Sequence, residues 1–329
     1  MTGALLAIVS AVFFPGIILR VKSIASGRKG PGILQPWKNI ILLFRKSSVF
    51  STTTSFIFRL APAVYLATIC CALMLLPFPG MPSVLGFEGD FILFAYLLAL
   101  GKLLFILGAL DTGSSFEGMG ANREALYSML TEPAFFILLG TLSLLSGQFS
   151  MQSIFHNLQF AGEFSLITGG IAIYLLVQIA MIENSRMPVD DPRTHLELTM
   201  VHEVMILDYS GLDLALIQTA TNLKFVLYGG LIANFLMPAV ADWSTLASTW
   251  HVACDTWHVA RDTWHLLDAT LNVSIFLVVE AVFAAAIGLM ESFRARKKLA
   301  KNPQFIVTLS SIALIGFILV LLLTRNLIR

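Results

Sequence analysis

Residues 183–211, ENSRMPVDDPRTHLELTMVHEVMILDYSG, form a polar segment between two long apolar segments of this 329-residue chain. The whole chain is 57% hydrophobic and only 12% charged, and its mean hydropathy is +0.82. A soluble domain has about a quarter of its residues charged. The composition therefore indicates an integral membrane protein, in which one polar loop carries much of the ionic chemistry.

The apolar segments are long and unbroken, which favours transmembrane helices. In lipid the backbone must satisfy its own hydrogen bonds, so only helices and closed barrels span a bilayer, and barrel strands alternate in polarity, which these segments do not. We expect an all-α, polytopic membrane protein with eight transmembrane helices, each close to the roughly 20 residues that cross a bilayer. The expected spans are 2–20, 58–79, 90–110, 124–147, 166–183, 222–240, 269–290 and 304–324.

The distribution of basic residues predicts the topology. The end of the first span and the loop after it hold Arg20, Lys22, Arg28, Lys29, Lys38, Arg45 and Lys46 and no acid. The loop after the seventh span holds Arg294, Arg296, Lys297, Lys298 and Lys301. Such loops face the cytoplasm, which places the N-terminus and the C-terminus outside. We therefore expect a single membrane domain, 1–329, with cytoplasmic loops 21–57, 111–123, 184–221 and 291–303.

Ionisable groups inside the expected spans are candidate functional residues, because each costs about 2.5–3.5 kcal/mol to insert at mid-bilayer. Carboxylates in apolar surroundings can exchange protons near neutral pH. The spans and the adjacent loop offer an ion-coupling set: Lys102, Glu124, Glu132, Glu183, Glu203 and Glu280. One interpretation is a proton relay or an ion-linked conformational role. The other is that Lys102 pairs with one glutamate and only ties helices together.

The loops hold two further helix predictions. The segment 33–46, which follows the turn Gly30-Pro31-Gly32, has apolar residues at helical spacing and predicts an amphipathic helix on the membrane surface. The basic residues of this segment either only set the membrane topology or bind a partner protein. A second helix is expected at 194–207, where His195 and His202 share one stripe. These histidines are either hydrogen-bonded structural residues or protonatable groups, and without a His-Glu-x-x-His order they do not predict zinc hydrolysis.

A threefold repeat, Thr-Trp-His, starts at Thr249, Thr256 and Thr263. Its period of seven predicts an amphipathic segment, 243–268, with tryptophans at the outer membrane interface. A metal-binding histidine stripe is disfavoured, because seven helical residues separate the rings by about 10 Å. The three cysteines, Cys70, Cys71 and Cys254, lack Cys-x-x-Cys spacing, so we expect no metal or cofactor bound by this chain.

Motifs in two loops give the chain a family resemblance. RKGPGILQ at 28–35, ENSRMPVD at 183–190 and DYSG at 208–211 resemble the cytoplasmic loops of the membrane subunit that respiratory complex I shares with energy-converting membrane-bound hydrogenases. LDTGS at 110–114, GANREA at 120–125 and THLELTM at 194–200 are similar to the hydrogenase branch, of the formate hydrogenlyase and hydrogenase-4 type. The quinone-using branch has an acidic residue where Arg193 stands and lacks the HLELTM segment.

The resemblance implies a non-catalytic anchor and ion-coupling subunit in the plasma (inner) membrane of a prokaryote. Its implied partners are the hydrogenase large and small subunits, which carry the nickel–iron site and iron–sulfur clusters, and antiporter-like membrane subunits. These partners would dock on, or couple through, loop residues that share a place in the family's motifs: Arg28, Lys29, Arg123, Arg186, Asp190, Asp191, His195, Glu197, His202 and Asp208. The alternatives are a quinone-chamber subunit of a complex I-like dehydrogenase and a standalone secondary transporter.

Overall fold

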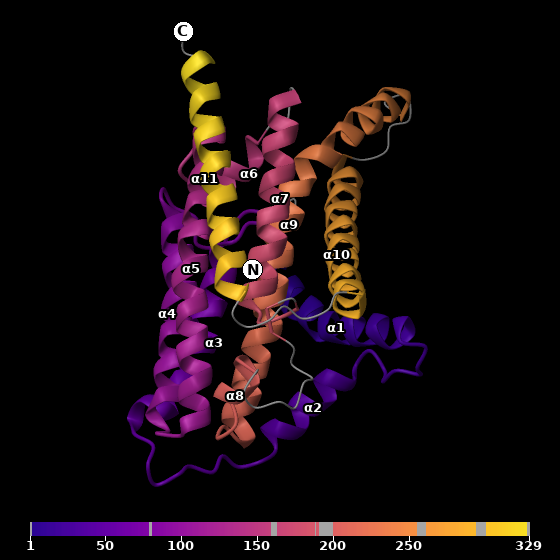
Figure 1. Ribbon diagram of the computed structural model, residues 1–329. Coiled ribbons are helices and arrows are strands. Elements are labelled where there is room, and N and C mark those ends of the chain that lie inside the picture. Colours follow the sequence, from indigo (N-terminus) through magenta and orange to yellow (C-terminus); the bar gives the residue numbers. More distant parts are fainter. Residues whose placement is uncertain are drawn as a thin grey trace.

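The chain is helical throughout the part that the computed structural model describes, which is residues 2–78, 81–158, 163–187, 189–190, 200–254, 261–293 and 301–327 (Figure 1). These residues contain no strand beyond an isolated bridge between Phe78 and Met81. The helices are α1 (Thr2–Ala25), α2 (Gln35–Phe44), α3 (Phe56–Leu75), α4 (Asp90–Asp111), α5 (Ser115–Ser146), α6 (Met151–His156), α7 (Glu163–Glu183), α8 (His202–Met205), α9 (Gly211–Cys254), α10 (Arg261–Phe293) and α11 (Asn302–Leu327).

The all-α, polytopic prediction is confirmed. Among the described residues, six helices are long and apolar enough to cross a membrane, namely α1, α3, α4, α5, α10 and α11, and α7 contains a shorter apolar stretch, Ile167–Glu183. All eight expected spans coincide with helices, and the span expected at 222–240 coincides with α9. The span expected at 58–79 extends four residues beyond the end of α3. The count of eight membrane crossings and the outside location of both termini stay predictions.

Several helices extend beyond the expected spans. Helix α5 begins at Ser115, so most of the segment 111–123 is helical, and α9 begins at Gly211 rather than at residue 222. The spans were bounded where hydropathy falls, whereas a helix continues as long as its polar end finds partners. Glu117, for example, is buried in the first turn of α5 and accepts a hydrogen bond from the Asp208 backbone N–H at 2.9 Å.

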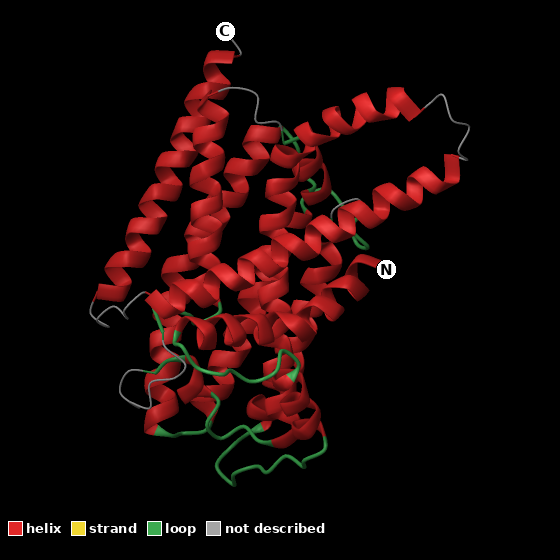
Figure 2. Ribbon diagram, turned by 90° about the vertical axis from the view of Figure 1, so that its right-hand side faces the viewer, coloured by secondary structure: helices red, strands yellow, loops and turns green. Residues whose placement is uncertain are grey.

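Two predicted amphipathic segments have different outcomes. The surface helix expected at 33–46 is confirmed as α2, in which Ile40 is buried while Ile41 and Leu42 are exposed. The amphipathic segment expected at 243–268 stays a prediction, because only its flanks are described, in α9 up to Cys254 and in α10 from Arg261. Residues 255–260, which include the second Thr-Trp-His repeat, lie outside the described residues. The ends of α9 and α10 that flank them extend away from the other helices (Figure 2).

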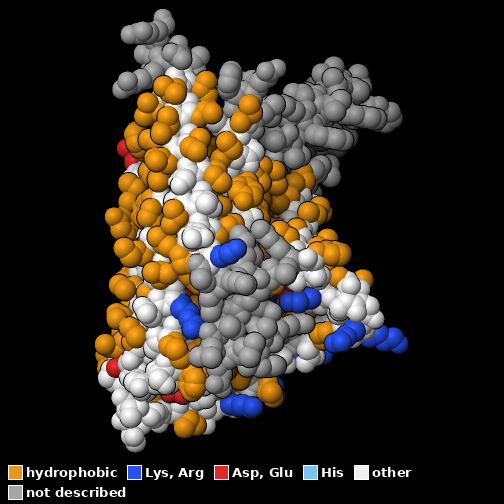
Figure 3. All heavy atoms as spheres, viewed as in Figure 1, with side chains coloured by type: hydrophobic (Ala, Val, Ile, Leu, Met, Phe, Trp, Pro, Cys, Tyr) orange, Lys and Arg blue, Asp and Glu red, His pale blue; other side chains and the backbone are white. Residues whose placement is uncertain are grey.

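Helix α9 lies at the centre of the arrangement and contacts α1, α3, α7 and α10, while α5 packs against α4 and α11. Helix α1 runs across the long axes of α4, α5 and α11, and the α2–α3, α4–α5 and α8–α9 connections gather at one end of the molecule (Figure 1). On the face in Figure 3, Lys and Arg side chains lie in the half nearer that end, whereas the other half is mostly apolar. Residues 294–300, which hold most of the second basic loop, lie outside the described residues, so the prediction that the basic loops share one side stays untested.

Carboxylates of α4 fix the starts of two other helices. Asp111 Oδ2 accepts hydrogen bonds from the backbone N–H groups of Ser55, at 2.7 Å, and Phe58, at 3.3 Å, at the start of α3. Asp90, which is fully buried, accepts from the Met151 N–H at 2.6 Å, at the start of α6. Both satisfy N–H groups that a helix start leaves without intrahelical partners. In this way the short connections are held to the long helices.

The Gly211→Ala substitution is expected to destabilise the protein by about 2–3 kcal/mol. Gly211 has a φ of +52°, and a Cβ there would collide with the Ser47 carbonyl oxygen. Gly113→Ala is the matched control, because Gly113 also has a positive φ, +70°, but no atom within 4 Å of the added Cβ, so it should cost only about 1–2 kcal/mol. Thermal unfolding of the detergent-purified variants measures both, and equal losses would contradict the steric argument.

Candidate functional site: a buried cluster of alternating charges

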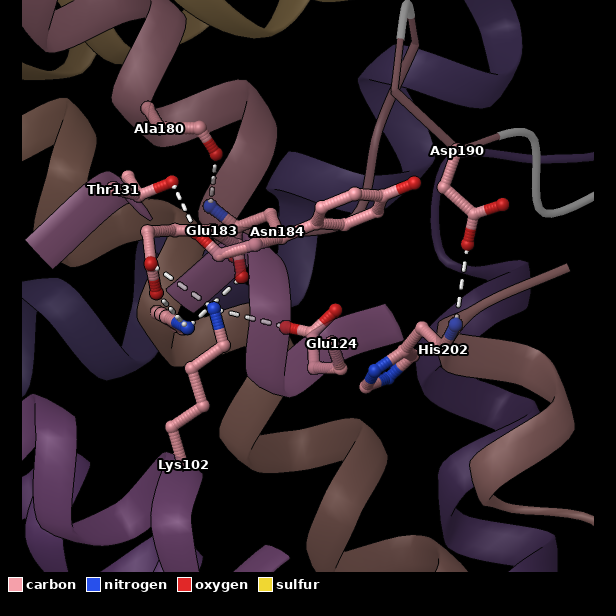
Figure 4. A network of polar contacts seen from close by, with 10 residues as sticks. Lys102, Glu124, Thr131, Ala180, Glu183, Asn184, Asp190 and His202 are labelled. Atoms are coloured by element: carbon pink, nitrogen blue, oxygen red, sulfur yellow. Dashed lines mark hydrogen bonds and ion pairs between the residues drawn. The ribbon is translucent and has the colours of Figure 1, made fainter. Parts of the chain in front are cut away.

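Four charged side chains from four helices meet inside the helix bundle. Lys102 Nζ of α4 lies 2.9 Å from Glu124 Oε1 of α5 and 3.0 Å from Glu183 Oε1 at the end of α7. Lys224 Nζ of α9 lies 2.9 Å from Glu183 Oε2. We call Glu124, Lys102, Glu183 and Lys224 the charge cluster; Figure 4 shows Lys102 pointing between its two carboxylate partners.

The charge cluster is balanced and shielded from solvent. None of its side chains is more than 9% exposed. Each oxygen of Glu183 takes one lysine, and Lys224 also donates to the Glu183 carbonyl oxygen at 2.9 Å. The attraction between neighbouring charges offsets the large free energy needed to remove four ions from water. The net charge is zero, so adding or removing one proton leaves an unmatched charge.

Local sequence explains why Glu183 ends α7 at this point. The Asn184 side chain donates to the Ala180 carbonyl oxygen at 2.8 Å, and the Arg186 N–H donates to the Met181 carbonyl oxygen at 2.8 Å. Ser185 adopts a φ of +49°, the left-handed conformation that commonly terminates a helix. The chain thus turns sharply after Glu183, and the carboxylate is held in the last turn, where the polar loop begins.

A small cavity joins Glu132 to the charge cluster. The cavity has a volume of about 20 Å³ and is lined by Lys102, Glu132, Glu183 and Tyr228 together with apolar side chains of α4 and α5. That volume is enough for one water molecule, and the polar lining would bind it. Glu132 is half-buried and makes no ion pair within the described residues. A single water in this cavity would connect its carboxylate with the charge cluster.

Comparisons with known proteins place this arrangement in a family. Residues 1–321 match the family model described as NADH dehydrogenase. The chain belongs to the NADH dehydrogenase family. It is 33% identical to hydrogenase-4 component C of Escherichia coli over 68% of this chain and 70% of that protein. It is 28% identical to formate hydrogenlyase subunit 4 of the same organism, over 67% and 71% of the two chains.

A solved structure confirms the fold of this family member. A chain of the membrane-bound sulfane sulfur reductase, an archaeal respiratory membrane complex, aligns with a TM-score of 0.75 and 20% identity. The alignment covers 97% of this chain and 98% of that chain. Together with the relatives, it makes this chain a multi-pass membrane subunit related to energy-converting hydrogenases, as the loop motifs predict.

Two predicted site residues lie on α8, next to the charge cluster. The His202 ring packs 5.3 Å from the Phe105 ring, and Glu124 lies between Lys102 and His202 in Figure 4. Burial lowers the pKa of His202 to about 4; Lys224, Arg186 and Lys102 add to the shift and Glu124 opposes it. His202 is therefore neutral at pH 7. Burial raises the pKa of Glu203, against the effect of Arg186 and with a contribution from Asp190.

Three of the predicted loop residues are engaged within the chain. Asp190 is 2% exposed, and its Oδ2 accepts from the backbone N–H groups of Val201 and His202 at 3.2 and 3.1 Å. Arg186 lies 3.3 Å from Glu291 Oε1 of α10, and Arg123 donates to the Met200 carbonyl oxygen at 3.1 Å. These contacts tie the loop after Glu183 to α5, α8 and α10.

The remaining predicted residues are spread more widely. Arg28 and Lys29, between α1 and α2, and Asp208, between α8 and α9, are exposed. Glu280 lies between α9 and α10, apart from the charge cluster. Asp191, His195 and Glu197 lie outside the described residues, as does most of the helix expected at 194–207. Its described part is helical only from His202 to Met205.

Sequence analysis missed Lys224, although the rule that identified Lys102 would also have found it. Lys224 lies inside the expected span 222–240, but near its start, where a lysine normally reaches the membrane surface. The partners of Glu291, a carboxylate evident in the sequence at the end of the seventh span, were not predicted: its oxygens lie 2.9 Å from Lys22 Nζ and 3.3 Å from Arg186. No sequence signal relates the ends of α1 and α10, which are 269 residues apart.

The Lys102→Met substitution is expected to destabilise the protein by about 3–5 kcal/mol, because it leaves the buried Glu124 carboxylate without its cation. The double variant Lys102→Met/Glu124→Gln should recover much of the loss, since both members of that pair are then neutral and Glu183 keeps Lys224. Thermal unfolding of the purified variants gives the coupling between the two sites. A double variant as unstable as the single one would refute the pairing.

Acidification is expected to lower the free energy of unfolding by about 3 kcal/mol because of His202. The folded pKa of about 4 lies below the ordinary value of 6.5. Between these values the unfolded chain binds a proton that the folded chain does not, so stability falls as pH decreases from about 6.5 towards 4. His202→Gln should flatten this part of the profile. Thermal unfolding at pH 7 and pH 5 tests it, and identical pH profiles for both proteins would refute it.

Proposed function

We propose that this chain is the membrane anchor and ion-coupling subunit of a membrane-bound [NiFe] hydrogenase complex. It would link electron transfer in a docked cytoplasmic arm to translocation of protons or sodium ions. The observation that carries the proposal is the balanced charge cluster at the start of the polar loop, in a chain whose relatives are the formate hydrogenlyase and hydrogenase-4 membrane subunits. Few other roles need four buried, paired charges inside a bundle of membrane helices.

The contacts of the loop suggest how a change outside the membrane reaches the charge cluster. Arg186 follows Glu183 by three residues and is paired with Glu291, and Asp190 holds the backbone that bears His202. Movement of the loop would displace Glu183 relative to Lys102 and Lys224. A carboxylate that loses a lysine partner becomes a better proton acceptor. The cluster would therefore take up a proton in one loop position and release it in another.

Glu132 is the residue through which we propose that a proton leaves the charge cluster. It lines the water-sized cavity beside Lys102 and Glu183 and is itself half-buried at the edge of α5. Two exposed side chains lie nearby: Met129, three residues earlier on α5, is 75% exposed, and Tyr96, whose ring lies 5.4 Å from that of Phe136 in the cavity lining, is 61% exposed. An ionisable group next to lipid is costly, which supports contact with another membrane subunit on this face. An antiporter-like subunit would then receive the proton or the electrostatic change.

Hydrogenase large and small subunits, with the nickel–iron site and iron–sulfur clusters, are the proposed partners on the loop-bearing end. Arg28, Lys29 and Asp208 are exposed loop residues available for such contacts, and no cofactor is assigned to this chain. The proposed location is the plasma membrane of a prokaryote. Gentle extraction of the tagged complex tests the assembly: nickel with hydrogen evolution is expected. Iron without nickel, together with quinone reduction, would instead identify a complex I-like dehydrogenase, and absence of any metal a standalone transporter.

The Glu132→Gln substitution is expected to abolish ion translocation while hydrogenase turnover with an artificial electron donor continues. The amide cannot accept the proton, and the metal sites belong to partner subunits. Ion uptake and hydrogen evolution in inverted vesicles measure the two activities. Glu88→Gln is the control, because Glu88 is exposed at the opposite end and should couple normally. Unchanged translocation in the Glu132 variant would refute this role.

A further inference from the structure

Helix α10 carries two glutamates that are equally buried but differ in their surroundings. Glu280 is 3% exposed and Glu291 is 6% exposed. Glu291, near the end of α10, lies within 2.9 Å of Lys22 Nζ and 3.3 Å of Arg186. Glu280 lies eleven residues earlier, about 16 Å along the helix. Both of its carboxyl oxygens are buried and have no hydrogen-bond partner among the described residues.

Gly229 of α9 provides the space for the Glu280 carboxyl. A Cβ on Gly229 would lie 2.6 Å from the carboxyl carbon and would collide with both oxygens. The carboxyl therefore packs directly against the backbone of α9. Aromatic rings dominate this region of α10, where Phe276 contacts Phe78 and Phe283 contacts Phe14. The Glu280 carboxyl group therefore lies in largely apolar surroundings.

The ionisable groups on the helices that pack against α10 are engaged elsewhere. On α1, Lys22 is paired with Glu291, and Arg20 is directed to the Gly30 carbonyl oxygen. On the described part of α9, Lys224 donates to Glu183, and Tyr228 lines the cavity beside Glu132. Asp213 lies about 24 Å from Gly229 along the helix, and the side chains of α9 beyond residue 236, which include Asp242 and His251, are not described. No cation is thus available to Glu280 within the described residues.

A buried carboxylate without a cation or hydrogen-bond donors is too costly to persist, so the group takes a proton instead. We propose that Glu280 is a proton-binding site separate from the charge cluster, and that the packing of α10 against Gly229 of α9 holds its carboxyl neutral. A monovalent metal ion does not fit as the ligand, because a hard cation needs several oxygen ligands, and here only one carboxyl group converges.

The placement on α9 couples this proton to movement of that helix. Consecutive helical residues point about 100° apart, so Tyr228 faces Glu183 and Glu132 while Gly229 faces Glu280. If α9 moves away from α10, water reaches the carboxyl and the proton is released; when the helices close, it is bound again. This property depends only on the packing, and it stands whether or not the partner complex is a hydrogenase.

The test compares the stability of the intact complex at pH 6 and pH 8 for the wild type and Glu280→Gln. A glutamate in an unfolded chain is ionised at both pH values. A carboxyl that is neutral in the folded state therefore releases a proton on unfolding, so rising pH favours unfolding. The wild type should lose stability relative to Glu280→Gln by about tenfold in the unfolding equilibrium constant per pH unit. Parallel pH profiles would overturn the proposal.

Two further variants keep the result decisive. Glu291→Gln is the matched control on the same helix: it removes an ionised, paired carboxylate, so it should lower stability at both pH values without changing the pH slope. Glu280→Met replaces the carboxyl with an apolar chain of similar length and should assemble as well as the wild type. Failure of both Glu280→Gln and Glu280→Met to assemble, while Glu280→Asp assembles, would show that an ionised group is required and would overturn the proposal.

Discussion

The free energy of placing a charge in hydrocarbon dominates this structure, and the charge cluster offsets it by pairing each buried charge with an opposite one. Lys102 and Lys224 neutralise Glu124 and Glu183 only because α4, α5, α7 and α9 converge at one point. Each helix contributes one charge, so displacing any of them leaves a partner exposed to apolar surroundings. The same interaction that holds the bundle together therefore makes it sensitive to a single proton. A neutral core would be as stable but could not respond.

Helix α10 shows the same constraint met in two ways. Near its end Glu291 is ionised and held by Lys22 and Arg186, which join α1, α10 and the polar loop. In its middle Glu280 has no cation partner among the described residues and lies against Gly229. The difference follows from depth, because lysine and arginine near a helix end keep contact with the membrane surface. Deep in the bilayer, a proton is the simplest neutralising ligand.

The polar loop gains order from contacts with buried groups on either side. Tyr209 stacks on Phe58 with ring centroids 4.1 Å apart, Asp190 holds the start of α8, and Arg186 lies over Phe225. Burial and the carboxylates of Glu117, Asp213 and Asp111 raise the pKa of Tyr209, which keeps it neutral as a packing group. Because Glu183 begins this loop and His202 lies within it, loop position and the electrostatics of the charge cluster are mechanically connected.

Composition and periodicity by themselves determined the class of protein, since a chain with 12% charged residues cannot fold in water as an ordinary domain. They also determined which residues are chemically unusual, because Lys102, Glu132 and Glu280 interrupt apolar segments, and the loop motifs determined the family. The tertiary structure alone decided the pairings. Lys102 pairs with two glutamates rather than one, Lys224 is the second lysine on Glu183, and Glu280 has no cation partner among the described residues. The physical reason is that hydropathy is a local property of the chain, whereas a buried charge is neutralised by residues that only folding brings within about 3 Å.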